Sequence, residues 1–149
     1  MQNETYDPLS IESKWQEKWE QGKKFQPIES DKKFSIVIPP PNVTGSLHMG
    51  HALEHSIIDV ITRVKRMNGF HTLWLPGTDH AWIITQLLVE KDLEESGVTK
   101  HDLGRDNFLS KVWEWKEKSG DNITNQMKSL GMSCDWSRER FTMDEGLSQ

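Results

Sequence analysis

One loop carries most of the structural information in this sequence, and it reads Pro39-Pro40-Pro41-Asn42-Val43-Thr44-Gly45-Ser46-Leu47-His48-Met49-Gly50-His51. It joins a short apolar run, residues 34–38, to a stretch whose apolar residues recur at helical spacing. The pattern predicts a strand, a turn and a helix start, with two histidines and a glycine where the helix begins. Because a helix N-terminus offers unpaired N–H groups and a positive dipole end, this turn suits an anion such as a triphosphate.

Upstream of this loop, the sequence predicts one helix and one strand. Asp7 and Pro8 are typical of an N-cap and a first helical residue, and Gly22 ends the helix. One face of that helix is apolar, at Ile11, Trp15 and Trp19. Residues 34–38 are apolar without alternation and Pro39 ends them, which predicts a strand covered on both faces, as in a parallel sheet.

Downstream of the loop, the sequence predicts a βαβ unit. The helical positions are apolar at Leu53, Ile57, Val60, Ile61, Val64 and Met67. Ser46 is the candidate N-cap of this helix, Gly69 its stop, and residues 70–75 the second strand. Strand, helix and strand in this order predict parallel strands with a right-handed crossover. The loops 39–46 and 76–80 leave the carboxyl ends of those strands, so we expect them to face one shared pocket.

The last part of the chain is predicted to be mainly helical. A helix is expected over residues 83–95 and a longer one over about 106–130, bent at Gly120 and capped by Gly131. The tail, residues 132–149, is expected to be a loop anchored by two aromatic residues, with Asp144 as a possible N-cap. The anchors are Trp136 and Phe141.

Length and composition limit the classes of protein that this chain can be. Its 149 residues fit one domain of ordinary size. We expect an incomplete α/β fold, a Rossmann-like parallel sheet with flanking helices over residues 34–149, preceded by a helical extension over residues 1–33. The net charge of −5 argues against a nucleic-acid-binding module acting alone. One cysteine, Cys134, and no long apolar run favour a cytoplasmic protein.

The two histidines of the loop, His48 and His51, leave three interpretations open. They could be structural, satisfying backbone groups at the helix start. They could bind zinc, although zinc needs three or four ligands and only Asp79 and His80 are obvious companions. They could donate hydrogen bonds to ATP phosphates, which Gly50 between them favours because a missing side chain lets a base or phosphate approach.

Asp79 follows the second strand and has two interpretations. As a short acidic residue before a predicted helix, it could be the N-cap of the segment that starts near Ala81. Alternatively, its carboxylate could pair with the ammonium group of a substrate. Taken alone Asp79 favours the cap, and beside the first loop it favours the ammonium.

The combined string of residues 39–52 resembles the His-x-Gly-His signature region of class I aminoacyl-tRNA synthetases, in the form found in valyl-tRNA synthetases. The leucine and isoleucine enzymes resemble it less, because the Pro-Asn-Val-Thr-Gly lead-in is the valine form. Further stretches that are similar to the N-terminal region of that family are residues 65–67, 72–81, 113–116 and 135–144.

The resemblance implies an ATP site in the first half of a Rossmann-like catalytic domain. The family joins valine to ATP as valyl-adenylate and passes the valyl group to tRNA. By this resemblance His48 and His51 are catalytic, because they stabilise charge on the phosphates. Thr44, His48, Gly50 and His51 bind ATP, with Gly50 making room for adenine. ATP comes with Mg²⁺ as a substrate complex, and no protein-bound metal is expected.

The resemblance also implies a valine site beside the ATP site. Pro39, Pro40 and Asn42 would line it, with the prolines forming a small rigid apolar wall. Asp79 would hold the valine ammonium group.

Two features of the chain differ from the family pattern, and the first is its extent. The signature Lys-Met-Ser-Lys-Ser, the editing domain and the anticodon-binding domain have no counterpart in these 149 residues. We therefore expect an N-terminal fragment with at most weak activity alone, most tRNA-binding parts missing and a possible complementing C-terminal polypeptide. Half a doubly wound sheet should leave an apolar edge and face exposed. The alternative is a non-catalytic truncated or degenerate paralogue that binds nucleotide or a partner subunit.

The second difference lies just after Asp79. Family members read Ala-Gly-Ile-Ala-Thr-Gln where this chain reads Ala81-Trp82-Ile83-Ile84-Thr85-Gln86. Trp82 stands where Gly is expected and Ile84 where Ala is expected. Glycine often marks a positive φ or a close backbone approach, which tryptophan resists. We predict that Trp82 narrows or fills part of the valine pocket, and that reverting both residues raises valine affinity or stability.

Overall fold

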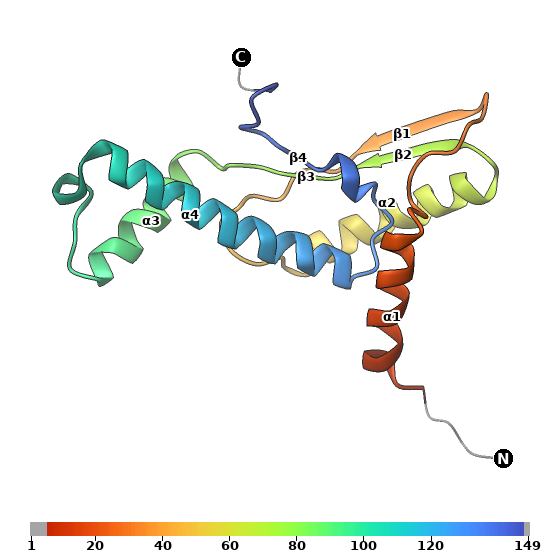
Figure 1. The fold of residues 1–149 in the computed structure, drawn as a ribbon, viewed down its shortest axis with the longest axis horizontal. Coiled ribbons are helices and arrows are strands. Elements are labelled where there is room, and N and C mark those ends of the chain that lie inside the picture. The colour runs from red at the N-terminus through yellow and green to blue at the C-terminus, as the bar shows by residue number, and fades with distance from the viewer. Residues whose placement is uncertain (1–5, 148–149) are drawn as a thin grey trace.

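The computed structural model describes residues 6–147, in which helices lie along one side of two short, two-stranded parallel sheets (Figure 1). The elements in chain order are α1 (Pro8–Gln21), β1 (Lys33–Val37), α2 (Met49–Met67), β2 (His71–Leu75), β3 (Gly77–Thr78), α3 (Ile83–Glu95), α4 (Lys100–Ser129), the short 3-10 turn η1 (Trp136–Arg138) and β4 (Arg140–Phe141). The predicted α/β class is confirmed, and the sheet is the short, partial one that was expected.

Helix α1 begins and ends where the sequence predicts. Asp7 is its N-cap and accepts a hydrogen bond from the N–H of Leu9 (3.2 Å), Pro8 is its first residue, and Gly22 follows its last turn. None of its residues is buried, and the helix projects from the body of the molecule (Figure 1). The helix therefore forms from its own caps and pattern, with little support from packing.

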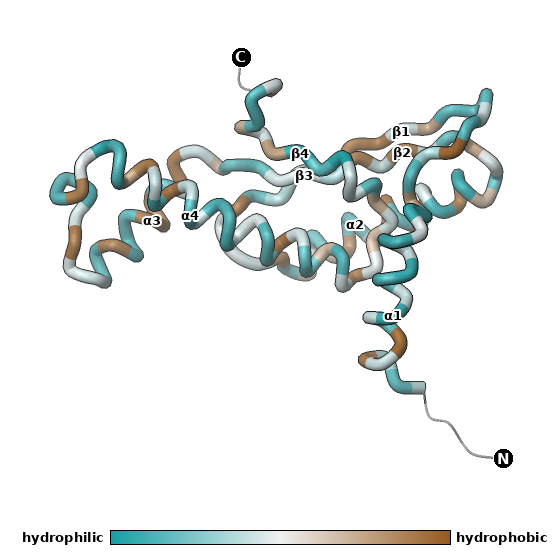
Figure 2. Tube along the Cα trace, viewed as in Figure 1, coloured by the Kyte–Doolittle hydropathy of each residue, from teal (hydrophilic) through white to brown (hydrophobic). Residues whose placement is uncertain are grey.

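The predicted βαβ unit is confirmed by the pairing of β1 with β2. The two strands run parallel, with Phe34 level with Thr72 and Ile36 level with Trp74. Thr72 and Trp74 are buried, and hydrophobic and hydrophilic residues are mixed along both strands (Figure 2). The prediction that β1 is covered on both faces is wrong, since its Val37 is 64% exposed and no β1 residue is buried. The physical reason is that the described helices cover only one face of this sheet.

Helix α2 ends as predicted but starts differently. Gly69 adopts a φ of +75° one residue beyond the C-cap Asn68, which is the left-handed position that glycine fills without strain. Ser46, the predicted N-cap, is wrong: the N-cap is His48, two residues further on. The imidazole replaces the hydroxyl because its ring nitrogen reaches a helix N–H, as described below.

The predicted bounds of α3 are confirmed, whereas α4 differs in two places. It begins at Lys100, and its one interior break lies at Gly104 (φ 73°, ψ 166°). The predicted bend at Gly120 is wrong, because that residue is helical and buried. A Cβ at Gly120 would lie 3.9 Å from a methyl group of Val43, an ordinary van der Waals distance, so the first loop lies against α4 here without requiring glycine. Gly131 follows the helix with a φ of +72°, as predicted.

The tail is not the predicted loop, because it adds strand β4 beside β3. The N–H of Arg140 donates to the carbonyl of Pro76 (3.2 Å), and the N–H of Thr142 donates to the carbonyl of Thr78 (3.2 Å). Phe141 is buried, as an anchor should be. Asp144 accepts a hydrogen bond from Phe141 N–H (3.0 Å), and residues 145–147 form turns, so no helix follows it there.

The core lies between the sheet and the C-terminal half of α4. Its fully buried members are Ile38, Trp74, Ile123, Met127, Met132 and Cys134, with Ile36, Leu47, Ile58 and Trp136 packed against them. Trp136 is thus the second predicted anchor. Burial raises the pKa of the Cys134 thiol well above its usual range, so the sulfur is neutral and unreactive. Over residues 6–147 the structure has no helix that is long and apolar enough to cross a bilayer.

Candidate functional site

The two predicted loops meet through backbone hydrogen bonds at the carboxyl ends of β1 and β2. The N–H of Asp79 donates to the carbonyl of Pro41 (2.8 Å), and the N–H of Val43 donates to the carbonyl of Asp79 (2.8 Å). Asn42 and Asp79 thereby form an isolated parallel bridge. The loops 39–46 and 76–80 therefore lie side by side, and that the predicted site residues face one shared pocket stays a prediction.

Two side chains of helix α4 bind backbone groups of the first loop. The indole N–H of Trp115 donates to the carbonyl of Val43 (3.1 Å), and the side-chain oxygen of Gln126 accepts from the N–H of Leu47 (2.8 Å). Sequence reasoning missed both anchors. A partial signal exists for Trp115, which lies in a stretch that resembles the synthetases, but nothing local marks Gln126 as a loop partner.

The predicted site residues of this loop lie at or near its surface. Pro39, Pro40 and Asn42 are exposed, and Thr44 is half-buried. The N–H of Thr44 donates to the carbonyl of Asn42 (2.8 Å), which closes a tight turn before the helix. Their side chains are therefore accessible to a ligand, whereas Pro41 and Val43 between them are buried.

His48 and His51 cap the start of α2 reciprocally. Nδ1 of His48 accepts from the N–H of Gly50 (3.1 Å), and Nδ1 of His51 accepts from the N–H of His48 (3.2 Å). The ring centroids are 3.9 Å apart. An imidazole that accepts through Nδ1 carries its proton on Nε2 when neutral. The structural interpretation of these histidines thus holds for their Nδ1 atoms, and it leaves an Nε2–H donor on each ring for a ligand.

Gly50 is required by this capping pair. A Cβ at that position would lie 2.8 Å from Cε1 and 2.9 Å from Nδ1 of His48, closer than non-bonded atoms allow. The glycine thus has a structural reason that sequence reasoning missed. That it also makes room for adenine stays a prediction.

Burial favours the neutral form of two histidines of α2, His51 and His55. The pKa of His51 is lowered mainly by burial and secondarily by its neighbour His48, and burial also lowers the pKa of His55. His55 is completely buried one turn along α2, with its ring centroid 6.0 Å from that of His51. Neither ring nitrogen of His55 has a hydrogen-bond partner within residues 6–147. A neutral ring donates a hydrogen bond through one nitrogen only. In the capping pair, His48 and His51, this nitrogen is Nε2, because Nδ1 of each ring accepts a backbone N–H.

Asp79 is not the N-cap of α3. That position belongs to Trp82, which makes no side-chain capping bond. Instead, the Asp79 Oδ1 atom accepts a hydrogen bond from the hydroxyl of Thr142 (2.9 Å), and its side chain is 32% exposed. The capping interpretation is therefore wrong, because the chain turns away too sharply at residues 81 and 82. The carboxylate keeps acceptor capacity that a ligand can use.

Thr142 and His80 complete the second turn. The Thr142 hydroxyl accepts from the backbone N–H of His80 (3.0 Å) and lies 2.5 Å from the Nδ1 atom of that ring. Because the hydroxyl donates its proton to Asp79, His80 must carry its own proton on Nδ1. Sequence reasoning did not single out Thr142, although it lies in a stretch that resembles the synthetases.

The unusual residue after Asp79 adopts the backbone that glycine favours. Ala81 has a φ of 53° and Trp82 a φ of 44°, both left-handed. Trp82 is 72% exposed, with its ring centroid 5.0 Å from that of His80 and the two rings tilted by 56°, and Ile84 is 52% exposed. Trp82 lines a cavity of about 170 Å³ between α3, α4 and the tail. The positive φ is confirmed, whereas the narrowing of a valine pocket stays a prediction.

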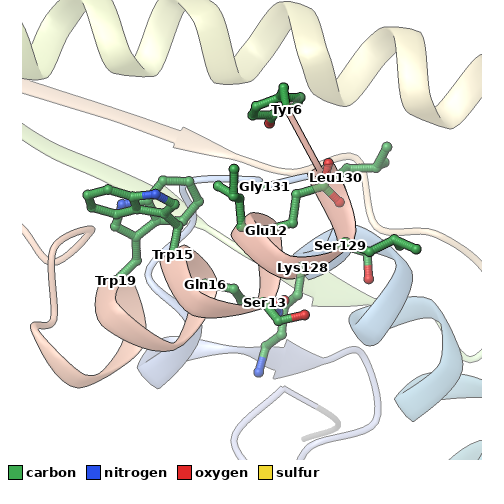
Figure 3. Close-up of a pocket in the computed structure, with 12 residues that line it drawn as sticks. Tyr6, Glu12, Ser13, Trp15, Gln16, Trp19, Lys128, Ser129, Leu130 and Gly131 are labelled. Carbon is green, nitrogen blue, oxygen red and sulfur yellow. The ribbon is translucent and has the colours of Figure 1, made fainter. Parts of the chain in front are cut away.

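A large hollow lies away from these turns. It has a volume of about 890 Å³ between α1 and the end of α4, and Figure 3 shows Trp15, Trp19 and Leu130 on its walls. It contains none of the predicted site residues. No group of three or more His, Cys, Asp or Glu side chains within residues 6–147 is arranged to hold a metal ion, so the zinc interpretation has no third ligand.

Comparisons with known proteins match almost the whole chain. The family model of class I tRNA synthetases (I, L, M and V) matches residues 14–149. The chain is 60% identical to a valine--tRNA ligase of Legionella pneumophila (strain Paris) over 146 residues, which are 98% of this chain and 16% of that protein. It is 58% identical to the valine--tRNA ligase of Pelagibacter ubique over 149 residues, 17% of that protein.

One solved structure has the same fold. It is the ternary complex of the Agrobacterium radiobacter K84 AgnB2 leucyl enzyme, LeuRS, with tRNA and LeuAMS, with a TM-score of 0.76 and 23% identity. The match covers 96% of this chain and 17% of that chain. At this identity the likeness supports the fold alone. The chain spans about a sixth of the length of the relatives that it matches.

Proposed function

Because this chain belongs to the class I tRNA synthetases (I, L, M and V), we propose that it supplies the first half of a valine-activating site. In the complete reaction, valine and ATP give valyl-adenylate and pyrophosphate, and the valyl group then passes to tRNA. The observation that carries the proposal is the backbone bridge between Asn42 and Asp79, which joins the turn before α2 to the acidic turn before α3.

The ATP half of the site is the start of α2. His48 and His51 each bind a backbone N–H through Nδ1, so both neutral rings have Nε2–H left to donate to phosphate oxygens. The helix N-terminus adds its dipole in the same place. Magnesium would come with ATP and neutralise phosphate charge, because hydrogen-bond donors suit phosphate oxygens rather than a cation.

The valine half of the site consists of the turn that carries Asp79, together with Pro39 and Pro40 of the first loop. Asp79 is partly exposed, and its Oδ1 atom accepts a hydrogen bond from Thr142 and lies 3.3 Å from Nδ1 of His80, so its other carboxylate oxygen can pair with an ammonium group. Pro39 and Pro40 are exposed beside Asn42 on the joined loop and would form a rigid apolar wall for a small aliphatic side chain.

The chemistry expected of these residues is positioning and charge stabilisation. A valine carboxylate oxygen attacks the α-phosphorus, the bond from that phosphorus to the bridging oxygen breaks, and pyrophosphate leaves. His48 and His51 would donate to oxygens on which negative charge grows, without giving up their protons. A single donor of this kind typically contributes about 10²–10³ in rate.

The chain covers 16–17% of its valine--tRNA ligase relatives, so we infer that the full reaction uses further polypeptide. That polypeptide, joined to this chain or complementing it as a separate subunit, would complete the ATP clamp and bind tRNA. We expect the reaction to take place in the cytoplasm, where a buried free thiol such as Cys134 stays reduced.

The proposal is tested by valine-dependent exchange of labelled pyrophosphate into ATP. The chain is assayed alone and after co-expression with the part of the Legionella pneumophila ligase that it does not match. We expect weak exchange alone and clear exchange together. His51→Asn keeps a capping acceptor but removes the Nε2–H donor, so it should lower exchange by about 10²–10³ while the helix content by circular dichroism is unchanged. No valine-dependent exchange in either state would contradict the proposal.

A second candidate is a non-catalytic chain that binds nucleotide or a partner subunit. The observation in its favour is Trp82, a bulky residue held at a φ of 44° immediately beside the acidic turn. This candidate predicts ATP binding without exchange, and exchange that does not return in Trp82→Gly.

A further inference from the structure

One face of α4 carries three side chains that form hydrogen bonds with the loop leading into α2. These side chains, which we call the α4 anchors, belong to Trp115, Asn122 and Gln126. Their separations of seven and four residues place them in one row, because seven residues make close to two helical turns and four make close to one. The row therefore faces the loop over its whole length, from Val43 to Leu47.

The anchors hold the loop at both of its ends. At the start, the indole N–H of Trp115 donates to the carbonyl of Val43 (3.1 Å). At the other end, the side-chain oxygen of Gln126 accepts from the N–H of Leu47 (2.8 Å). The side-chain amide of Asn122 adds a longer bond of 3.3 Å to the hydroxyl of the serine before Leu47. Two of the three bonds go to backbone groups, so they fix the path of the chain itself.

The anchored end of the loop is directly joined to the histidine cap. Leu47 precedes His48, the N-cap of α2, and the N–H of His48 donates to Nδ1 of His51 (3.2 Å). Because each peptide unit is planar, only the two backbone torsions of Leu47 lie between its anchored N–H and the N–H of His48. The Leu47 side chain packs against the hydrophobic core, which restricts these torsions. The direction of the capping N–H thus depends on the bond from Leu47 to Gln126.

Helix α4 is itself fixed to α2 through the segment that follows it. Asp59 accepts from the N–H of Ser133 (2.9 Å), and Nη1 of Arg66 donates to the hydroxyl of Ser133 (2.6 Å). Nη2 of Arg63 donates to the carbonyl of Gly131 (2.7 Å). The second half of α2 therefore holds the end of α4, while α4 holds the loop before α2. The anchors place this loop relative to the helix that the loop begins.

We propose that the α4 anchors are positioning residues for ATP, which keep the capping pair of His48 and His51 formed before the nucleotide binds. The inference rests on the proposed function and gives α4 a part in ATP affinity without contact with ATP. A preformed donor pair need not be ordered during binding. The apparent affinity falls with the fraction of chains in which the pair is formed. Anchors that served only the stability of the fold would weaken the use of both substrates alike.

The test is titration of the nitrogen-15-labelled full chain with magnesium-ATP, followed at the Nε2 signals of His48 and His51. The double variant Trp115→Phe with Gln126→Leu removes one donor and one acceptor and keeps side chains of similar size. We expect its dissociation constant for magnesium-ATP to rise about tenfold. This corresponds to about 1.4 kcal/mol, the net contribution of one or two hydrogen bonds.

A matched control makes the same kinds of change outside the row of anchors. Trp113→Phe with Asn125→Leu replaces one indole and one amide at exposed positions of α4, and the dissociation constant should be unchanged. Circular dichroism and urea unfolding of each variant report folding independently of ATP. Equal loss of affinity in the two double variants, or no loss in either, would overturn the proposal.

A second readout needs no ATP. Gln126→Leu should speed hydrogen exchange at the Leu47 amide and shift the Nδ1 signal of His51, because the capping N–H is no longer held in place. Gln126→Glu keeps an acceptor oxygen at the same reach and should restore both signals. An unchanged His51 signal in Gln126→Leu would overturn the proposal, because the cap would then form without the anchor.

The kinetic readout separates positioning from a general loss of structure. In pyrophosphate exchange with the Legionella pneumophila polypeptide, Trp115→Phe with Gln126→Leu should raise the KM for ATP about tenfold and leave the KM for valine unchanged. An equal rise in both KM values would overturn the proposal.

Failure of the proposed function gives a different result. In that case ATP shifts neither histidine signal in the wild-type chain, whereas Gln126→Leu still disturbs the cap. This result would overturn the ATP site and leave the α4 anchors as positioning residues of the cap alone.

Discussion

The turn before α2 and the turn before α3 leave the same end of the sheet, but they are held in different ways. In the first, His48 and His51 bind backbone groups within three residues of themselves. In the second, the conformation depends on Thr142, more than sixty residues further along the chain, which binds both Asp79 and His80.

The two turns also differ in backbone strain. The first uses glycine at Gly50, where a side chain has no room. The second places Ala81 and Trp82 in left-handed conformations that L-residues with large side chains rarely adopt. A turn made by local caps can form without strain, whereas a turn held from a distance can keep an unfavourable residue because tertiary contacts determine its shape.

Among the changes that separate the two turns, the largest loss of stability is expected from removing the Thr142 hydroxyl. Thr142→Val deletes the hydroxyl that contacts Asp79 and both the backbone and ring nitrogens of His80, leaving buried groups without partners. We expect a loss of about 2–3 kcal/mol in the free energy of unfolding, measured in urea. Thr142→Ser keeps the hydroxyl and should retain most of the stability. Equal losses in both variants would mean that the methyl group, not the hydroxyl, holds the turn.

The first turn should respond to added volume. Gly50→Ala places a Cβ within 2.8 Å of the His48 ring, so the ring must move and the cap is lost. We expect a cost of about 1–2 kcal/mol, similar to the loss of an N-cap. In a His48→Asn background the smaller amide leaves room, so the same Gly50→Ala change should cost less, and a double-mutant cycle measures the difference. Additive costs would contradict the steric account.

Relief of strain in the second turn should have a smaller, opposite effect. Trp82→Gly removes an exposed ring and a Cβ from a left-handed position, so we expect a gain of about 1 kcal/mol, measured as a raised urea midpoint. Trp82→Ala removes the ring but keeps the Cβ, and should give no such gain. If adding Ile84→Ala to Trp82→Gly also raises valine affinity, the pocket prediction is supported. A stability gain in the alanine variant would assign the effect to the ring.

The smallest effect concerns pH. The pKa of His55 is lowered in the folded state from 6.5, mainly by burial, so the unfolded chain binds its proton at a higher pH than the folded chain. The stability that depends on a neutral His55 is therefore complete above about pH 6.5 and is lost as the pH falls toward the lowered value. His55→Gln should flatten the fall in melting temperature between pH 7 and 5. An unchanged slope would assign that fall to other groups.

The sequence predicts the parts of this fold that depend on near neighbours. The ends of α1 at Asp7 and Gly22 and the stop of α2 at Gly69 follow from caps and left-handed glycines. The start of α2 was misplaced because the hydroxyl of Ser46 is the ordinary cap, and a histidine pair that caps reciprocally has no such familiar pattern.

Features that depend on distant residues were beyond sequence reasoning. Strand β4 has two residues, too few to show alternation, and its partner lies more than sixty residues earlier. The periodicity of α2 predicts a helix, but the side that faces the body is chosen by Asp59 and Arg66 through Ser133. The predicted site residues lie at one end of the sheet because parallel strands place both loops there, whereas Thr142 has no spacing that links it to those loops. His55 does have such a spacing, since it lies four residues after His51 on the same face of α2.

The most direct test of the site is the protonation of its two capping imidazoles, observed by nitrogen-15 NMR of the labelled chain with and without magnesium-ATP. Because both Nδ1 atoms accept backbone N–H groups, we predict the proton of His48 and of His51 on Nε2 and none on Nδ1. We further predict that ATP shifts both Nε2 signals while the exposed His101 does not respond. Protons on Nδ1, or Nε2 signals that ATP leaves unchanged in the complex with the Legionella polypeptide, would contradict the account.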